Sequence, residues 1–267
     1  MTRRIALRLQ YLGQDFCGWQ RQPNRIAVQQ VLEETIQQIT GQSAVIHGAG
    51  RTDAGVHASG QVAHFDTDSP IPPDRWANIL NAHLPSGIAV LESAEVGNHW
   101  HAQFSAIWRR YRYVIHTHPV PSAFLRPFSW HYYYADLCAE LMHEALQPML
   151  GEHDFRAFQR SGSKRRHACL TVHLAKCWRE GSLIFVELQA SGFLYGMIRL
   201  LMGQLVRVGS GELQIHQFTH IWQTGARSLV KYAAPPQGLC LIGVGYPDSP
   251  FQQAITEPFP PLGAGKI

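Results

Sequence analysis

The apolar residues of the first hundred positions follow two periods. Residues 4–11 (RIALRLQY) alternate apolar and polar side chains, which is the period of a half-buried strand. Residues 27–41 carry apolar side chains at helical spacing and stop at Gly41, a residue type that favours helix ends. We therefore expect the order strand, helix, two strands, helix, strand. The other predicted elements of this half are extended segments at 43–50 and 59–67, a helix at 72–84 that begins with two prolines, and a strand at 87–96.

The second half of the chain shows the same two periods less regularly. Residues 167–178 and 182–190 predict a hairpin with a short Arg-Glu-Gly connection. A helix is predicted from a capping Asp136 to Gly151, and its apolar face contains Leu137, Leu141, Ala145 and Met149. The remaining predicted elements are strands at 104–116, 130–135 and 238–246, and helices at 194–211 and 214–225.

Strands and helices are mixed along the whole chain, which indicates the α+β class. We expect two α/β-sandwich-like subdomains, each a mainly antiparallel sheet with helices on one face. No close internal repeat is present in the sequence. The expected domains are residues 1–103 and 104–267.

Composition restricts the class of protein further. The 267 residues are 45% hydrophobic and 16% charged, which is typical of a folded chain rather than a disordered one. The five cysteines are scattered and form no C-x-x-C pair, so we expect free thiols rather than a disulfide framework. No apolar run approaches the roughly 20 residues that span a bilayer. We expect a cytoplasmic protein that does not contact a membrane.

Two clusters of cations stand out against the modest net charge of +4. Such clusters neutralise phosphates, and the interleaved aromatic residue of the first can stack on a base, so both are RNA-binding candidates. The alternative for each is an ordinary solvated surface. The clusters are Arg109, Arg110 and Arg112 in RRYR, and Lys164, Arg165 and Arg166 in KRRH.

A single aspartate lies in the glycine-rich stretch GAGRTDAGVHASGQVAHF, residues 48–65. Gly48 and Gly50 are expected to let the chain turn sharply before Asp53, and Gly55 after it. The stretch is neither a P-loop nor a G-x-G-x-x-G motif, so phosphate binding explains it poorly. Asp53 is either a turn residue with a local ion pair to Arg51 or an ionised carboxylate directed at an electron-poor carbon.

The literal string resembles a known family. GAGRTDAGVHASGQV is similar to the signature of the tRNA pseudouridine synthase I family, enzymes that isomerise uridines in the anticodon stem-loop. Further blocks occur in the family's order, so the resemblance covers nearly the whole chain. These blocks are GWQRQP (18–23), VQQVLEE (28–34), LNAHLPSGIAV (80–90), HAQFSAIWRRYRY (101–113), GEHDFRAF (151–158), GFLYGMIRLLMGQLVRVGSG (192–211) and APPQGLCL (234–241).

The resemblance implies an activity and a set of partners. The enzyme would convert uridine to pseudouridine at tRNA positions 38, 39 and 40, without cofactor or metal. Asp53 falls where the family has its nucleophile and would attack either C1′ of the ribose or C6 of the uracil. The resemblance further implies a catalytic cleft between the two subdomains and a homodimer whose interface involves the C-terminal domain.

Four other residues take roles from the resemblance. Arg199 would pair with Asp53 and keep it ionised, and Arg51 would fill the space left by the extracted nucleotide. Tyr111 would stack on the uracil and assist proton removal from C5, and Leu239 would line the pocket. Three of them have a plainer reading, namely a helix-surface arginine for Arg199 and a core side chain for Tyr111 and Leu239.

The chain departs from the family at several positions. The differences are Leu12 and Gln14 in the first block, Gln103 in place of an arginine, and Gly196 in place of a larger polar residue. Gly196 is expected to cost a helix up to about 1 kcal/mol against alanine. The histidines of HWH and HTH lack a completing carboxylate or cysteine, so a zinc site is not expected.

Two other functions use the same residues. The first is a catalytically inactive tRNA-binding or chaperone protein on the same scaffold. The second is a hydrolase that uses Asp53, although a glycosidase would need a second nearby carboxylate, and the next one along the chain is Asp66.

Overall fold

The computed structural model describes residues 2–160, 167–252 and 259–260. Contacts divide the chain into two compact units, which are Met1–Arg109 with Cys240–Ile267 (unit 1) and Arg110–Leu239 (unit 2). The predicted boundaries, 1–103 and 104–267, differ from this division at the C-terminus. The last strand belongs with unit 1 because it pairs there with an early strand. Both units mix helices with strands that are mostly antiparallel, so the predicted α+β class is confirmed.

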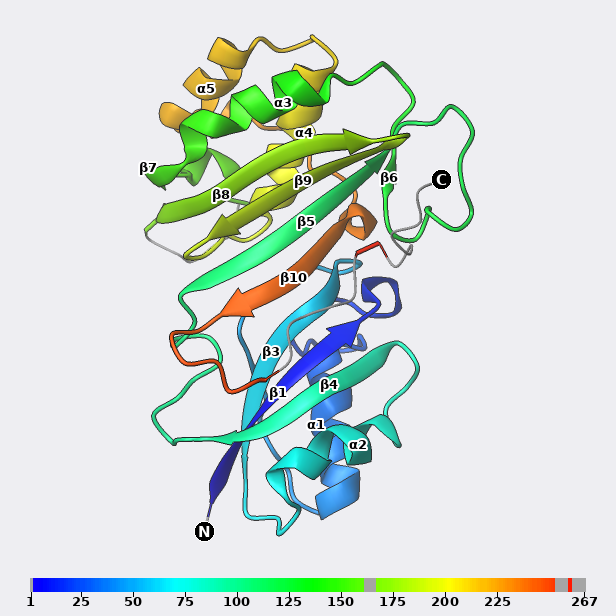
Figure 1. The fold of residues 1–267 in the computed structure, drawn as a ribbon, viewed down its shortest axis with the longest axis vertical. Helices are drawn as coiled ribbons and strands as arrows, with labels where there is room; N and C mark the ends of the chain where they lie inside the picture. The colour runs from blue at the N-terminus through cyan, green and yellow to red at the C-terminus, as the bar shows by residue number, and fades with distance from the viewer. Residues whose placement is uncertain (1, 161–166, 253–258, 261–267) are drawn as a thin grey trace. The chain divides into compact units, whose positions relative to one another are not determined.

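The sheet of unit 1 has the order β4-β1-β3-β10, with β2 beside β3. β10 runs parallel to β3, and the other pairs are antiparallel. The helices α1 and α2 lie on one face of this sheet (Figure 1). The bounds are β1 Arg3–Tyr11, α1 Val28–Thr40, β2 His47–Gly48, β3 His57–Thr67, α2 Trp76–Asn81, β4 Ile88–Val96 and β10 Leu239–Gly245.

The central strand β1 is covered on both faces. Ile5, Leu7 and Leu9 are fully buried on one side, as the alternating pattern predicts. The prediction of a half-buried strand is wrong for the other side, where Ala6 packs in a second apolar cluster and Arg8 is buried in an ion pair with Glu92. This second cluster forms because the segment after β4 and the end of β10 cover the face that has no helix. Its buried members are Ala6, Ala49, Val62, Trp100, Ala102 and Tyr246.

The sheet of unit 2 has the order β5-β9-β8-β7, and β6 pairs with β5. The predicted hairpin is confirmed as β8 and β9, with Gly181 at φ +56° in the turn. The helix α3 packs on β8, and α4 and α5 pack on α3 (Figure 1). The bounds are β5 Trp108–His116, β6 Trp130–His131, α3 Ala139–Leu146, β7 Gly151–Asp154, β8 Cys169–Glu180, β9 Leu183–Ala190, α4 Met197–Gly209 and α5 Ile215–Gln223.

Two details of the predicted helix at 136–151 are wrong. Its N-cap is Cys138, which makes no side-chain cap bond, so Asp136 lies outside the helix. Leu141 is 39% exposed, whereas Met142 is fully buried. The shorter helix buries the Met142, Ala145 and Leu146 side because that side packs on β8 and α4.

Short 3-10 turns connect the main elements. Among the helices of the described residues, none has both the length and the apolar composition needed to cross a membrane. The 3-10 turns are Gly13–Asp15, Pro73–Arg75, Gln147–Met149, Arg156–Phe158, Arg227–Leu229 and Pro236–Gly238.

Candidate functional site

Asp53 lies in the connection from β2 to β3 of unit 1. The backbone N–H of Val56 donates to the Asp53 carbonyl at 3.1 Å, and Gly55 follows at φ +81°, so the chain turns directly after the aspartate. The Asp53 side chain is half-buried, Arg51 is exposed, and Thr52 between them is buried. Neither Gly48 nor Gly50 has a positive φ, so the expectation that both supply unusual backbone angles is wrong.

Buried polar groups hold this loop in place from below. The Thr52 hydroxyl and the Tyr11 hydroxyl share a hydrogen bond of 2.8 Å. The Gln61 side-chain amide donates to the Gly50 carbonyl at 2.7 Å and to the Tyr11 oxygen at 3.4 Å. Burial raises the pKa of Tyr11 well above its usual value, against the opposing effect of the Thr52 bond, so the phenol stays protonated. The carboxylate of Asp53 is therefore carried on a loop with fixed backbone on both sides.

Sequence reasoning missed Tyr11, Thr52 and Gln61 as parts of the site. Gln61 is fully buried in a strand whose neighbours are apolar. A polar amide at such a position must find hydrogen-bond partners in the fold, because an unpaired one would be costly. A glutamine in an apolar strand therefore predicts a buried hydrogen-bond partner, and the structure shows that this partner is the Asp53 loop.

Glycines let neighbouring segments approach the loop closely. A Cβ on Gly48 would come within 2.4 Å of the Trp19 ring, and a Cβ on Gly18 within 2.5 Å of the Thr52 carbonyl oxygen. The N–H of Trp19 donates to that same carbonyl at 3.1 Å. Gly48 is thus required for space rather than for its backbone angles.

Leu12 and Gln14, the two departures in the first block, flank a glycine that packs against the end of the Asp53 loop. Between them, Gly13 packs so tightly that a Cβ would come within 2.2 Å of the Val56 carbonyl oxygen. Its N–H donates to the buried His57 ring at 3.1 Å. Gln14 itself is exposed. Gly13, between the two departures, is therefore a residue of this block that packs against the end of the Asp53 loop.

Arg109, one of the RNA-binding candidates, is anchored in unit 1. Its guanidinium donates from Nε and Nη2 to the Ala49 carbonyl, at 3.2 and 3.0 Å, and from Nη1 to the Ala106 carbonyl at 3.2 Å. It also donates to the carbonyl of Gln103. Since Ala49 begins the Asp53 loop, Arg109 contributes to the position of that loop. Gln103 takes part through its backbone, and its side chain is exposed.

Unit 2 contains Tyr111 and Arg199, and Leu239 is its last residue. Tyr111 is 7% exposed and meets Phe193 edge-on, with ring centroids 5.0 Å apart. Arg199, in the first turn of α4, donates from Nε to the Ala234 carbonyl at 2.7 Å. Leu239 is buried at the start of β10. Phe193, which contacts Tyr111, precedes Arg199 by six residues along the chain.

Arg110 and Arg112 share one carboxylate. Both guanidinium groups pair with Glu187, whose side chain is 3% exposed, and both remain partly exposed. Arg112 also lies over the rings of Trp178 and Phe185. The pair keeps a net positive charge on the sheet of unit 2. The remaining RNA-binding candidates, Lys164, Arg165 and Arg166, lie outside the described residues.

Gly196 requires a correction. It lies at the N-cap of α4 with φ +70°, not inside the helix, so the expected helix penalty does not apply. Positive φ favours glycine, and asparagine tolerates it better than other residues do. The difference from a larger polar residue is therefore compatible with the local backbone.

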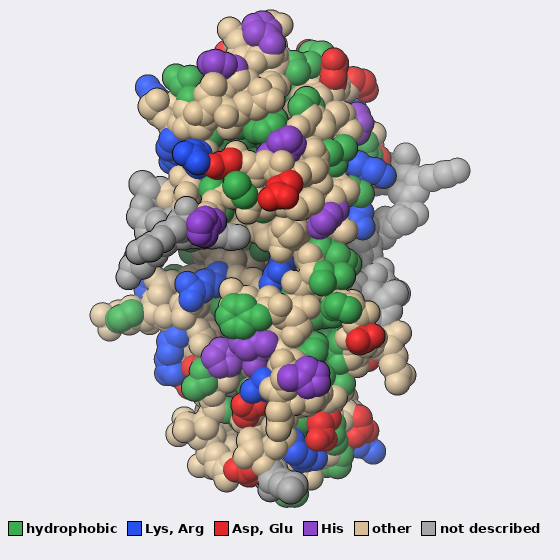
Figure 2. All heavy atoms as spheres, turned by 90° about the vertical axis from the view of Figure 1, so that its left-hand side faces the viewer, with side chains coloured by type: hydrophobic (Ala, Val, Ile, Leu, Met, Phe, Trp, Pro, Cys, Tyr) green, Lys and Arg blue, Asp and Glu red, His purple; other side chains and the backbone are tan. Residues whose placement is uncertain are grey.

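Several histidine side chains are visible at separate places on the surface drawn in Figure 2. In unit 1 the rings of His47, His64 and His101 lie against one another, with centroids 4.5 to 5.4 Å apart. No group of three or more His, Cys, Asp or Glu side chains in the described part of the chain is arranged to hold a metal ion.

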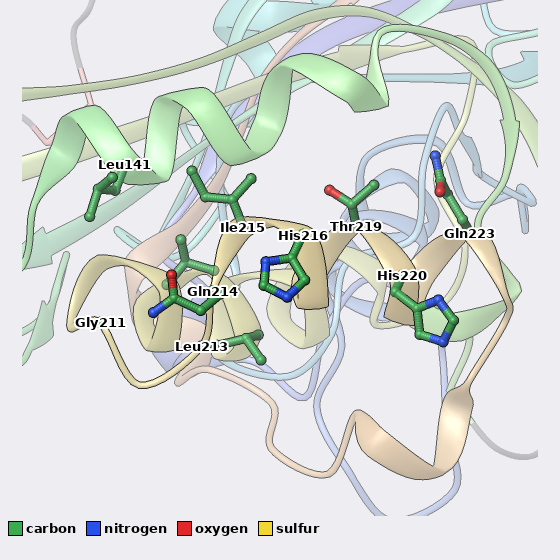
Figure 3. Close-up of a pocket in the computed structure, with 10 residues that line it drawn as sticks. Leu141, Gly211, Leu213, Gln214, Ile215, His216, Thr219, His220 and Gln223 are labelled. Carbon is green, nitrogen blue, oxygen red and sulfur yellow. The ribbon is translucent and has the colours of Figure 1, made fainter.

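A hollow of about 710 Å³ lies on the helical side of unit 2, between α3 and α5. Leu141 of α3 and His216 and His220 of α5 line it (Figure 3). None of the predicted site residues contributes to its lining.

Comparison with known proteins decides the family. A family model described as tRNA pseudouridine synthase matches residues 9–105 and 145–247, ranges that include Asp53, Arg199 and Leu239 but not Tyr111. The chain belongs to the tRNA pseudouridine synthase family. It is therefore an isomerase that forms pseudouridine in tRNA, which confirms the enzyme class inferred from the resemblance.

Individual relatives are similar over almost the whole chain. The tRNA pseudouridine synthase A of Picosynechococcus sp. is 57% identical over 259 residues, covering 96% of this chain and 94% of that protein. The proteins of the same name from Thermosynechococcus vestitus and Nostoc sp. are each 54% identical. The match to the Thermosynechococcus vestitus protein covers 96% of this chain and 91% of that protein. The match to the Nostoc sp. protein covers 94% of this chain and 89% of that protein.

Proposed function

We propose that this tRNA pseudouridine synthase acts on the anticodon stem-loop, at positions 38, 39 and 40, with Asp53 as its nucleophile. The observation that carries the proposal is the Asp53 loop. Its carboxylate is half-buried on a turn whose backbone is fixed by Tyr11, Thr52 and Gln61. Covalent catalysis needs a carboxylate held in this way, because misplacement by about 1 Å costs a large part of the rate.

The reaction is an isomerisation in which atoms balance without a cofactor. The Asp53 carboxylate attacks C1′ or C6, the bond between C1′ and N1 breaks, and the base turns. A new bond then forms between C1′ and C5, and the bond to the Asp53 oxygen breaks, which regenerates the carboxylate. The proton on C5 leaves, and N1 gains a proton. Tyr111 is proposed to stack on the uracil and assist the loss of the C5 proton.

The other roles complete the proposal. Arg199 is proposed to form an ion pair with the Asp53 carboxylate. Arg51, which is exposed beside Asp53, occupies the place of the extruded nucleotide, and Leu239 lines the uracil pocket. Extrusion from a stem costs a few kcal/mol, so a side chain that fills the gap helps the enzyme. We propose that the protein works as a homodimer in the cytoplasm.

The replacement Asp53→Asn tests the nucleophile. It keeps the size of the side chain and removes the charge, so we expect the rate to fall at least about a thousandfold. The measurement is tritium release from tRNA labelled at uridine C5, with single uridines at positions 38, 39 or 40. The matched control is Asp68→Asn, an exposed aspartate of the same unit. Pseudouridine formation by Asp53→Asn at the wild-type rate would show that another group is the nucleophile.

A further inference from the structure

Arg160 and Tyr195 of unit 2 form an exposed pair that none of the proposed roles uses. The guanidinium carbon of Arg160 lies 5.2 Å from the centre of the Tyr195 ring, and its Nη1 donates to the phenol oxygen at 3.1 Å. The Arg160 N–H also donates to the Tyr195 carbonyl at 3.2 Å. Tyr195 is nevertheless 51% exposed. The pair is fixed by three contacts and still open to solvent.

The backbone of the turn explains this position. Gly196 follows Tyr195, has a left-handed backbone conformation and is the N-cap of α4. It packs against the Arg160 side chain, because a Cβ on Gly196 would lie 3.5 Å from two Arg160 carbons. The segment therefore keeps Tyr195 outside the helix and next to Arg160. An exposed cation–π contact contributes only about 0.5–1 kcal/mol, so this pair adds little to the free energy of unfolding.

The same short segment carries residues of the proposed site. Phe193 contacts Tyr111, and Arg199 lies in the first turn of α4. Tyr195 lies between them in the sequence. Tyr195 is thus two residues from the ring that contacts Tyr111 and four residues from Arg199 along the chain.

We propose that Arg160 and Tyr195 form a nucleotide subsite that binds a residue of the tRNA next to the modified uridine. The Tyr195 ring stacks on the base, and the Arg160 guanidinium donates hydrogen bonds to its phosphate. An aromatic ring beside a fixed, permanently charged planar donor matches both parts of a single unpaired nucleotide. This inference rests on the proposed function, since it takes RNA as the ligand and Tyr111 and Arg199 as its neighbours.

The test compares Tyr195→Leu and Tyr195→Phe in binding and turnover of an anticodon stem-loop RNA. Base stacking on an aromatic residue predicts that Tyr195→Leu raises KM and Kd by about 5- to 150-fold, while the rate at saturating RNA changes little. Tyr195→Phe keeps the ring and should stay within about threefold of wild type. Tyr133→Leu is the matched control, because Tyr133 is a similarly exposed tyrosine (56%) elsewhere in unit 2.

RNA variants identify the stacked base. Each nucleotide flanking the target uridine is replaced in turn by an abasic residue. At one abasic position the affinity of the wild-type protein should fall by the same factor as the Tyr195→Leu replacement causes with intact RNA. The affinity of Tyr195→Leu for that abasic RNA should fall no further. Arg160→Ala should reduce the slope of log K against log salt by about 0.7 to 0.9, the value of one phosphate contact.

Three results separate the possible failures. Equal affinity of Tyr195→Leu and wild type, with normal pseudouridine formation, would overturn the subsite and leave the proposed function intact. Full additivity of Tyr195→Leu with every abasic position would also overturn it, because the tyrosine would then act on folding or on another partner. Wild-type protein that forms no pseudouridine in the stem-loop would instead overturn the proposed function.

Discussion

Single residues in this protein decide how the Asp53 loop is held. Tyr11, Thr52 and Gln61 satisfy one another in a buried network, and Gly48 leaves room for Trp19. These residues contact the backbone or neighbouring side chains of the loop that carries the carboxylate. Replacing them should therefore change the rate of the chemical step more than the affinity for RNA.

The replacement Gly48→Ala tests this interpretation at its tightest contact. The new Cβ would overlap the Trp19 ring, and Trp19 is nearly fully buried, so the ring or the loop must move. We expect a loss of about 1–3 kcal/mol in the free energy of unfolding. The rate of tritium release should fall at least about tenfold with RNA affinity unchanged, measured by single-turnover kinetics and filter binding.

Gly41→Ala provides the control for stability. Gly41 ends α1 at φ +72°, and a Cβ there meets nothing within 4 Å. Alanine in this conformation strains the backbone and should lower stability by about 1 kcal/mol without changing the rate. If both variants lose the same stability and neither loses rate, Gly48 has no part in positioning the loop.

At the level of elements, β3 joins the two cores of unit 1. Phe65 faces α2 and meets Trp76, whereas His64 on the opposite face packs against Trp100 and His101 in the segment after β4. The Nδ1 atom of His64 accepts a hydrogen bond from the N–H of Ala102. A neutral His64 thus fastens this segment to the sheet.

The neutrality of His64 gives a pH dependence. Burial, with smaller contributions from His101, Arg4 and His47, lowers the pKa of His64 to about 3. In the unfolded chain the histidine has its ordinary pKa of about 6.5, so below that pH the unfolded chain binds a proton that the folded chain does not. The free energy of unfolding therefore decreases as the pH falls from about 6.5 towards 3. One such group changes the free energy of unfolding by up to about 1.4 kcal/mol per pH unit.

The replacement His64→Gln should remove this contribution. Its amide oxygen can still accept from Ala102, but the side chain does not titrate. Urea unfolding between pH 6.5 and 4 should therefore show a flatter pH dependence than wild type. His83→Gln, an exposed histidine of unit 1, should follow wild type. Parallel curves for His64→Gln and wild type would mean that the folded His64 takes up its proton normally.

The whole molecule has a net charge of +4, and several of its cations have structural partners. Arg109 is bound to backbone carbonyls, and Arg110 and Arg112 are paired with Glu187, so part of the positive charge has structural partners. Arg110 and Arg112 remain partly exposed and outnumber their one carboxylate. Phosphate contacts from such groups should still supply a large share of tRNA affinity.

We expect tRNA affinity to fall steeply with salt. Each phosphate contact contributes a slope of about −0.7 to −0.9 to a plot of log K against log salt, so four contacts give a slope near −3. Fluorescence anisotropy between 50 and 300 mM KCl measures it, and circular dichroism over the same range shows that the protein stays folded. A slope near zero would show that contacts between basic side chains and phosphates do not contribute to tRNA affinity.

The sequence by itself determined the mixed strand and helix order, the β8–β9 hairpin and the literal match that places the chain in its family, because these depend on local periodicity and on the order of residues. Only the tertiary structure decided that β10 returns to unit 1, that β1 is buried on both faces and that Gly196 begins α4 rather than interrupting it. It also showed that Gln61 and Tyr11 hold the loop around Asp53. These features arise from contacts between segments far apart along the chain, which local periodicity does not predict. The one local sign of such a contact is a polar residue at a position where the pattern predicts an apolar one.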